Sequence, residues 1–464
     1  MKISFHGADQ GVTGSCHLVE CAGKKVLIDC GLYQGGRELV EENTEPFGFD
    51  PADIDILLLT HAHLDHCGRV PLLAKRGFCG EIITTAATVE LARLVMLDSA
   101  GLQEEEARYQ LRRAQRRGKH KHKAIEPLYT TLDALNSLEF IGRRVSYDSP
   151  MQLTPGIRAT FFDAGHILGS ASILLELEED GRQHRLLFSG DLGYSGRAIL
   201  RDPTPPPQAD TVVMETTYGD RLHKQLQPSI DEFYEAINET LGRGGNVIIP
   251  TFALERTQEI LYYLREGIEN KSLEHFINVF LDSPMAISAT QIFERHPECY
   301  DTETLEISHD GNDPFDMPGL RFTRETAESM ALNRIAGGAV IMAGSGMCTG
   351  GRVRHHLKHN LWHKKNSIVF VGYAAHGTLA RRIIDGAERV RIYGEDIPVR
   401  ASIYTIGGFS AHADQAELLA WHQHTDNPKT TFLVHGEVGS METFAKKLTG
   451  TQVEIPSLHQ VYEF

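Results

Sequence analysis

The chain of 464 residues lacks the features that mark membrane and secreted proteins. It has no apolar run close to the roughly 20 residues that a membrane-spanning helix needs. Residues 1–9 contain one lysine followed by an acidic residue, without the apolar core of a secretory signal. With 41% hydrophobic and 23% charged residues, the composition is that of a soluble globular protein. We therefore expect a cytoplasmic protein that does not associate with membranes.

The chain has no cysteine pattern typical of disulfide-rich or cysteine-ligated zinc proteins. The seven cysteines form no CxxC pair, and their odd number does not suit a framework of disulfides. Neither a disulfide scaffold nor a cysteine-ligated zinc site is therefore expected. This pattern is typical of proteins from the reducing cytosol.

Positive charge is also in short supply. The chain has 46 Lys and Arg against 62 Asp and Glu, which gives a net charge of −16. Because affinity for phosphates depends largely on Lys and Arg, this balance argues against binding a polyanion over the whole surface. A local groove stays open, since metal cations and a few well-placed arginines can hold a phosphodiester inside an acidic protein.

The stretch that carries most information is residues 60–66, Thr-His-Ala-His-Leu-Asp-His, which follows a short apolar run expected to be a buried strand. In extended backbone His61 and His63 point the same way and can bind one ion. Asp65 and His66 follow and face a neighbouring position. The alternative is a polar loop with incidental histidines, but this register predicts a site for two metal ions.

More polar residues stand where predicted strands end. His166 follows a strand over residues 157–162, and Asp191 follows a hairpin strand, each beside glycine. His435 ends a strand near the C-terminus. Such positions deliver side chains to a shared pocket, and Asp191 is a natural bridging carboxylate. Asp29 ends another hairpin, and two interpretations of it stay open: a turn-forming residue, or a partner that orients a metal-bound histidine.

Two stretches have both a structural and a functional interpretation. Residues 88–97 have helical spacing with Thr88 as the N-cap, and a basic run over residues 108–123 follows three glutamates. Acidic residues near the N-terminus of a helix and basic residues near its C-terminus interact favourably with the helix dipole, so a solvated helix is favoured over an RNA-contacting surface.

The turn at residues 344–346, Gly-Ser-Gly, is either a phosphate-binding turn or a plain connection from strand to helix.

At this point the ordered motifs resemble those of a known family. Asp29, the stretch 60–66, His166 and Asp191 are similar to the ligand set of the metallo-β-lactamase fold hydrolases. Three further motifs resemble the β-CASP branch of that family, which consists of nucleases with an inserted domain: residues 215–219, 409–412 and 435–437. The resemblance implies an α/β (α+β) chain in which an αββα metallo-β-lactamase sandwich holds an inserted β-CASP α/β domain. The expected divisions are residues 1–219 and 409–464 for the sandwich and 220–408 for the insertion.

The resemblance also assigns roles to residues. It implies two zinc ions per chain, with seven ligands: His61, His63 and His166 for one ion, Asp65, His66 and His435 for the other, and Asp191 for both. The implied catalytic residues are Asp65, Glu215, His412 and Asp29. The implied substrate-binding residues are Ser283, Ser345, Gly346, Gly377 and Thr378, and we add Arg352 as part of the basic segment described below. One departure is Glu255, where relatives tend to have glycine.

The resemblance is strongest to the RNA-cleaving members of the branch. It implies a zinc-dependent ribonuclease in which a hydroxide shared by two zinc ions attacks phosphorus, and His412, paired with Glu215, protonates the leaving 3′ oxygen. The products would be 3′-hydroxyl and 5′-phosphate ends. The alternatives are a non-catalytic metal-binding subunit of an RNA-processing complex and a small-molecule hydrolase. Endonuclease or 5′-exonuclease action, the RNA recognised and the formation of a homodimer stay open.

RNA binding by an acidic chain needs a confined basic surface. The expected surface is the segment from Arg352 to Lys358, which follows the turn at residues 344–346 and contains two arginines, two histidines and a lysine. The rival surface is the basic run at residues 108–123. We expect Arg352 to contribute more to RNA binding than the rival run.

Overall fold

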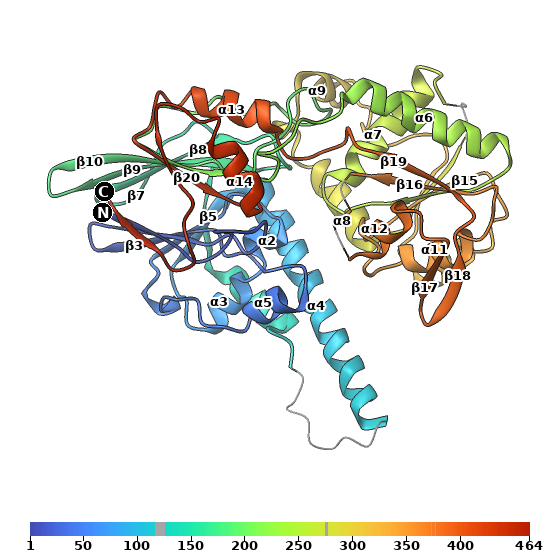
Figure 1. Ribbon diagram of the computed structural model, residues 1–464, viewed down its shortest axis with the longest axis horizontal. Helices are drawn as coiled ribbons and strands as arrows, with labels where there is room; N and C mark the ends of the chain where they lie inside the picture. Colours follow the sequence, from blue (N-terminus) through green and yellow to red (C-terminus); the bar gives the residue numbers. More distant parts are fainter. Residues whose placement is uncertain (117–125, 274–276, 373, 376) are drawn as a thin grey trace. The chain divides into compact units, whose positions relative to one another are not determined.

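The computed structural model describes residues 1–116, 126–273, 277–372, 374–375 and 377–464 (Figure 1). The chain forms two compact units. The first comprises Met1–Ser195, Asp202–Leu222 and His412–Phe464, and the second comprises Gly196–Arg201 and His223–Ala411. The second unit is thus inserted into the first, and its longer part begins and ends close to the divisions expected at 219/220 and 408/409.

The first unit contains two seven-stranded sheets, of which one is built mainly from the N-terminal residues. Its strand order is β22-β1-β2-β3-β4-β5-β6. Antiparallel pairing joins the first hairpin, and parallel pairing joins β3 to β4 and β4 to β5. The strands are β1 (Lys2–Phe5), β2 (His17–Cys21), β3 (Lys24–Ile28), β4 (Ile56–Leu58), β5 (Glu81–Thr85), β6 (Ile141–Val145) and β22 (Val461–Glu463). The predicted hairpin and the predicted buried strand before the stretch 60–66 are both confirmed.

The second sheet of this unit has the order β21-β20-β11-β10-β9-β8-β7. Its strands are β7 (Met151–Thr154), β8 (Ile157–Asp163), β9 (Ala171–Glu179), β10 (Arg182–Phe188), β11 (Thr211–Glu215), β20 (Thr430–Val434) and β21 (Gln452–Glu454). Residues of both sheets, such as Val26 and Phe161, share one apolar core. The sheets therefore form a sandwich with this core between them.

Helices cover the two outer faces of the sandwich. Those near the first sheet include α4, which contacts β5 and β6, and α5, which packs on α3 and α4. Helix α14 contacts β20 of the second sheet, and side chains of α13 and α14 share a second apolar cluster with that sheet. The helices are α1 (Arg37–Glu42), α2 (Leu64–Cys67), α3 (Val70–Lys75), α4 (Ala86–Arg116), α5 (Thr131–Ser137), α13 (Gln415–Gln423) and α14 (Val438–Ala445), with short 3-10 turns at Pro51–Asp53 and Leu138–Phe140. The expected αββα arrangement is confirmed.

The start of α4 corrects one expectation. Thr88 is not the N-cap, because the helix begins at Ala86, directly after β5. The hydroxyl of Thr85 accepts a hydrogen bond from the backbone N–H of Thr88 at 3.2 Å, while the hydroxyl of Thr88 donates to the carbonyl of Gly169 at 2.9 Å. Thr85, the last residue of the strand, thus satisfies a backbone N–H in the first turn of the helix, and no loop is needed between strand and helix.

The second unit is built on a six-stranded parallel sheet in the order β14-β13-β15-β12-β16-β19. Its strands are β12 (Val247–Pro250), β13 (Asn278–Leu281), β14 (Leu320–Phe322), β15 (Ala339–Ala343), β16 (Ser367–Val371) and β19 (Ser402–Ile406), and a separate hairpin pairs β17 (Arg389–Ile392) with β18 (Glu395–Pro398). Its helices are α6 (Leu226–Gly242), α7 (Arg256–Glu269), α8 (Pro284–Phe293), α9 (Thr302–His309), α10 (Thr326–Leu332), α11 (Val353–Asn360) and α12 (Leu379–Ile384), with a 3-10 turn at Pro297–Cys299. Continuous apolar strands alternating with helices had predicted this α/β unit.

Glu255, the residue that departs from the family pattern, has backbone strain and a charged partner. Its φ is +63°, in the left-handed region that favours glycine. Its buried carboxylate lies 3.2 Å from the guanidinium of Arg197, which also approaches Glu259 at 3.4 Å. A buried carboxylate needs a partner of opposite charge, and Arg197 supplies one to each glutamate.

No helix among the residues described above is both long enough and apolar enough to cross a membrane.

Candidate metal centre

The stretch 60–66 lies where β4 leaves the apolar core. Its backbone turns from strand into the short helix α2, and Gly31 packs against that turn. A Cβ on Gly31 would lie 1.6 Å from the carbonyl oxygen of Asp65, so no larger residue fits there without displacing this backbone. The close approach of two loops thus fixes the position of Asp65.

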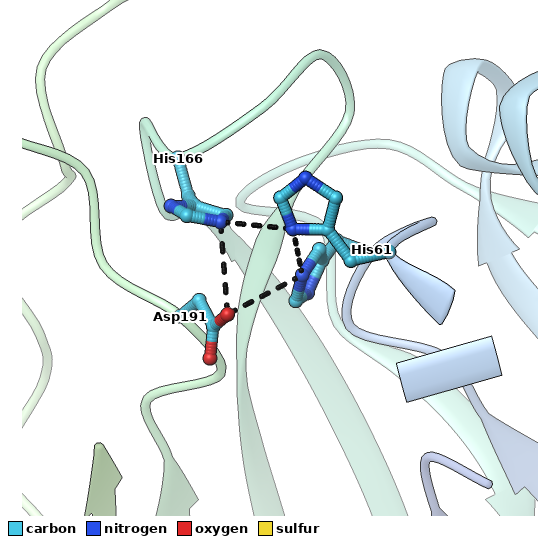
Figure 2. Close-up of side chains that lie close together, drawn as sticks. His61, His166 and Asp191 are labelled. Carbon is cyan, nitrogen blue, oxygen red and sulfur yellow. Dashed lines mark hydrogen bonds and ion pairs between the residues drawn. The ribbon is translucent and has the colours of Figure 1, made fainter. Parts of the chain in front are cut away.

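Four ligand atoms from three separate loops converge in a first cluster. The Nδ1 atom of His63 lies 3.1 Å from Nε2 of His61 and 3.2 Å from Nε2 of His166. Both Nε2 atoms lie 3.5–3.6 Å from Oδ2 of Asp191. Figure 2 shows His61, His166 and Asp191 pointing toward one another. Nitrogen ligands at about 2.0–2.1 Å from a tetrahedral zinc ion are spaced by about 3.3 Å, so this donor set fits zinc.

A second cluster lies on the other side of Asp191. Nε2 of His66 lies 3.3 Å from Nε2 of His435, which lies 3.6 Å from Oδ2 of Asp65. Nε2 of His66 is also 3.3 Å from Oδ1 of Asp191. Asp65, His66 and His435 can therefore hold a cation together.

Asp191 links the two clusters, because each of its carboxylate oxygens faces a different group of histidines. The residue is only 2% exposed, and its Oδ1 accepts no hydrogen bond from the part of the chain that the structure describes. A buried carboxylate oxygen without a donor is unfavourable, and a cation on each side of Asp191 would remove this cost. The residues present therefore fit two metal ions that share this carboxylate.

The protonation states differ between the clusters. Burial lowers the pKa of His61 well below its ordinary value and that of His63 to about 4, so both rings are neutral and able to bind a metal. Burial also acts to lower the pKa of His66, but the carboxylates of Asp191 and Asp29 outweigh it and raise that pKa well above its ordinary value. A cation must displace this proton, which weakens metal binding as pH falls.

Asp29 orients His66. Its Oδ2 accepts a hydrogen bond from Nδ1 of His66 at 2.7 Å, which leaves the lone pair of Nε2 facing the second cluster. The backbone N–H and the hydroxyl of Thr60 each donate to Asp29 at 2.8 Å. Asp29 has a φ of +60°, so it also occupies a tight turn. The geometry thus combines the two interpretations of this residue that the sequence left open.

Two threonines were not assigned a role from the sequence. The hydroxyl of Thr60 lies 3.0 Å from Nδ1 of His61, and the hydroxyl of Thr217 lies 3.1 Å from Nδ1 of His435. Each hydroxyl lies within hydrogen-bond distance of a ring nitrogen and can help to fix the ring's orientation. The only signal in the sequence is their position at a strand end within a ligand motif, which does not reveal the contact.

Glu215 and His412 form a pair at the edge of the first cluster. Nδ1 of His412 lies 3.1 Å from both carboxylate oxygens of Glu215, which also accept hydrogen bonds from the backbone N–H groups of Leu192 and Thr217. Nε2 of His412 is 4.0 Å from Oδ2 of Asp191. Burial acts to lower the pKa of His412, but the carboxylate of Glu215 outweighs it and raises the pKa to about 9. This imidazole can therefore hold a proton at neutral pH.

The six predicted substrate-binding residues all lie in the second unit, and several have structural partners there. Ser283 and Thr378 are the N-caps of α8 and α12. The hydroxyl of Ser345 accepts hydrogen bonds within its own turn, and a Cβ on Gly346 would meet the ring of Phe252 at 2.7 Å. Gly377 has a φ of +81°.

The guanidinium of Arg352 is bonded to other residues of the protein. It forms an ion pair with Asp282 at 2.7 Å and donates to the carbonyls of Thr323 and Arg324 at 3.0 and 2.6 Å. Three of its five N–H groups thus have acceptors. A direct contact with RNA stays a prediction.

Some residues singled out in the sequence lie outside the described residues. They are Arg117, Lys119, Lys121 and Lys123 of the basic run, and Tyr373 and His376 of the segment that leads to the predicted substrate-binding residue Gly377.

Comparison with known proteins agrees with the geometry. A family model described as the metallo-beta-lactamase superfamily matches residues 9–235, one described as the Beta-Casp domain matches 257–383, and one described as the Zn-dependent metallo-hydrolase RNA specificity domain matches 396–456. The chain is 41% identical to ribonuclease TTHA0252 of Thermus thermophilus, over 97% of this chain and 96% of that protein. This chain belongs to the β-CASP branch of the metallo-β-lactamase superfamily. It is therefore a metal-dependent hydrolase of that family, as the sequence predicted.

Two other proteins are similar over almost the whole β-CASP chain. Transcription termination factor FttA of Methanocaldococcus jannaschii is 31% identical, over 98% of this chain and 70% of that protein. A crystal structure of a protein of unknown function from Enterococcus faecalis superimposes with a TM-score of 0.55 at 11% identity, over 99% of each chain. The second similarity shows the fold alone.

The role of Asp29 can be tested through metal affinity. The substitution Asp29→Asn removes the charge that holds Nδ1–H of His66, so we expect the affinity for one of two ions to fall by about 10–100-fold. Competition with a chromophoric chelator measures both affinities. Asp180→Asn is the matched control, because Asp180 is exposed and has a similar φ of +53°. Unchanged affinities in Asp29→Asn would mean that Asp29 only shapes the turn.

Proposed function

We propose that this β-CASP protein is a zinc-dependent ribonuclease that hydrolyses phosphodiester bonds and leaves 3′-hydroxyl and 5′-phosphate ends. The observation that carries the proposal is the pair of His412 and Glu215, a protonated imidazole held beside a cluster of metal-ligand type. The name of the Thermus thermophilus relative, a ribonuclease at 41% identity over nearly the whole chain, supports RNA as the substrate.

Each residue of the site has a task in this reaction. His61, His63 and His166 would hold one zinc ion, Asp65, His66 and His435 the other, and Asp191 both. The ions supply Lewis acidity and lower the pKa of water. The pKa of Asp65 lies below its ordinary value, because the contact with His435 and the nearby histidines outweigh the effect of burial. Asp65 is therefore an ionised acceptor that can orient the attacking water.

The leaving 3′ oxygen needs a proton as its bond to phosphorus breaks. His412 can donate one from Nε2, because Glu215 binds Nδ1 and thereby fixes the tautomer and the ring orientation. The carboxylate of Glu215 is 1% exposed and is held by backbone N–H groups, so it does not need a metal of its own. The same pair would argue against a merely structural metal-binding subunit.

Hydrolysis of RNA with and without chelator tests the proposal. Zinc-loaded protein should cleave single-stranded RNA to products with 5′-phosphates, cleavage should stop with chelator, and added zinc should restore it. Metal binding without RNA cleavage would instead support a non-catalytic metal-binding subunit. Hydrolysis of small esters or lactams, but not of RNA, would support a small-molecule hydrolase. Closed circular RNA and RNA with a 5′-monophosphate or triphosphate separate endonuclease from 5′-exonuclease action.

The metal content is a second test. Seven candidate ligands exceed what one tetrahedral ion uses, so elemental analysis of the purified protein should find close to two zinc ions per chain. A stoichiometry of one that persists after reconstitution with zinc would contradict the two-metal site.

A third test assigns His412. As a general acid that is not a ligand, it should be dispensable for metal binding, so His412→Ala should lower kcat by roughly 10²–10⁴-fold with unchanged zinc content. His424→Ala, at an exposed histidine, is the control. Loss of zinc in His412→Ala would show that His412 is a metal ligand and would contradict its proposed role as a general acid paired with Glu215.

The pH profile of the same site gives an independent readout. An acid works only while protonated, so the contribution of His412 is present below its pKa and is lost as pH rises through it, near 9. Because the carboxylate of Glu215 raises this pKa, Glu215→Gln should move the alkaline limb of the rate profile to lower pH. A limb that stays in place would show that another group donates the proton.

A further inference from the structure

Helix α4 consists of two parts with different surroundings. The buried side chains of the helix lie within residues 87–100, and none of residues 101–115 is buried. The last hydrogen bonds from the helix to α5 and its preceding loop are those of Gln103 with Leu128, at 3.1 Å, and Glu104 with Thr131, at 2.8 Å. Residues 105–116, called the arm below, extend for about 18 Å at 1.5 Å per residue. Figure 1 shows this part of α4 pointing away from the rest of the first unit.

The arm is helical without help from tertiary packing. Its sequence, Glu-Glu-Ala-Arg-Tyr-Gln-Leu-Arg-Arg-Ala-Gln-Arg, consists almost entirely of residues that favour helix. It continues a helix that is already packed, so no new nucleation is needed. The arm therefore adds no side chain to the core, and the stability of the first unit does not require it.

Arginines of the arm lack the partners that arginines have elsewhere. Within the described part of the chain, Arg108, Arg112 and Arg113 form no ion pair, and the hydrogen bonds of the first two go to carbonyls of their own helix, at 3.2 and 3.3 Å. By contrast, Arg143 and Arg158, also exposed in the first unit, each pair with a glutamate at 2.7 Å. After Glu106 the sequence has no acidic residue until Glu126. The arm thus carries four arginines against the two glutamates at its start, an excess of positive charge in a protein of net charge −16.

An exposed aromatic ring lies among these cations. At 3.6 residues per turn, Arg108, Tyr109, Arg112 and Arg113 fall within an arc of about 140° on one side of the helix. Tyr109 is 58% exposed. Guanidinium groups bind phosphate oxygens in pairs, and an exposed ring stacks on unpaired bases, so this combination suits a single-stranded nucleic acid.

Other partners fit the arm less well. The exposed Leu102 and Leu111 are nine residues apart and therefore lie about 180° apart around the helix, so they form no apolar stripe for a lipid surface or a partner helix. The deep, narrow major groove of an RNA duplex does not admit a helix. Single-stranded RNA remains as the partner whose chemistry matches arginine and tyrosine together.

We propose that the arm binds single-stranded RNA and holds a part of the substrate that is not at the metal centre. This inference rests on the proposed action on RNA and adds an anchoring surface to it. Long RNA should then be bound and cleaved more efficiently than a short oligonucleotide occupying only the metal centre. It also reverses the ranking expected from the sequence, in which Arg352 contributes more than the basic run.

The test compares two triple variants with equal loss of charge. Arg108→Gln/Arg112→Gln/Arg113→Gln changes the arm and keeps good helix formers, whereas Arg93→Gln/Arg144→Gln/Arg182→Gln removes three exposed arginines elsewhere in the first unit. Fluorescence anisotropy with labelled single-stranded RNA is measured over a range of salt, with chelator present so that no cleavage occurs. The arm variant should reduce the slope of log Kd against log salt by about two, at about 0.7 for each of three phosphates. The control should stay close to wild type, and circular dichroism checks that α4 is retained.

Cleavage supplies a second readout. The arm variant should lower kcat/KM for a long RNA by at least about tenfold while leaving a short oligonucleotide unaffected. Binding is measured with chelator and therefore does not depend on cleavage. If the protein binds RNA through the arm but shows no nuclease activity, the proposed function is contradicted and the inference about the arm stands. Equal salt slopes for wild type and the arm variant, or an equal loss in the control, would overturn the inference. A loss of binding to a polyglutamate peptide, with RNA binding unchanged, would reassign the arm to an acidic protein.

Discussion

The arrangement of the first unit depends on one buried carboxylate, that of Asp191. A buried anion is tolerated only when cations or hydrogen-bond donors surround it, and the neutral rings of His61 and His63 cannot supply the missing charge. Oδ2 of Asp191 faces His61 and His166, while Oδ1 faces His66. One cation on each side of Asp191 would resolve this problem, since each oxygen faces its own group of histidines. The fold must therefore bring loops from distant parts of the chain to a single point.

Close backbone packing makes this convergence possible. A Cβ on Gly193 would lie 1.8 Å from the carbonyl oxygen of Gly165, so the loops that carry Asp191 and His166 can meet only because residue 193 is glycine. Gly31 has the same role opposite Asp65. The sheets of the sandwich hold the strand ends rigidly, and the glycines let the loops touch. Ligand positions are thus fixed by packing, before any ion binds.

Much of this could be predicted from the sequence, because strand ends and ligand residues are local features. The run before the stretch 60–66 is strand β4, and apolar strands alternating with helices gave the parallel sheet of the second unit. The contacts of Thr217 with His435 and of Arg352 with Asp282 could not be predicted, because they join residues 218 and 70 positions apart. Spacing within a motif says nothing about such partners. The start of α4 was also missed, since its capping Thr85 belongs to a strand.

The contrast between Arg352 and the arm shows why counting basic residues does not locate a binding surface. Arg352 pairs with Asp282, which is 0% exposed and is also bonded to His356 at 2.6 Å, so its guanidinium belongs to a buried polar network of the protein. The arginines of the arm neutralise nothing within the described structure. Arg112 and Arg113 lie about 9–10 Å along the helix from Glu106, the nearest acidic residue in the sequence, which is slightly more than the Debye length of about 8 Å at physiological salt. The repulsion between RNA and an acidic protein is therefore largely screened at the arm, while its arginines can still contact phosphates directly.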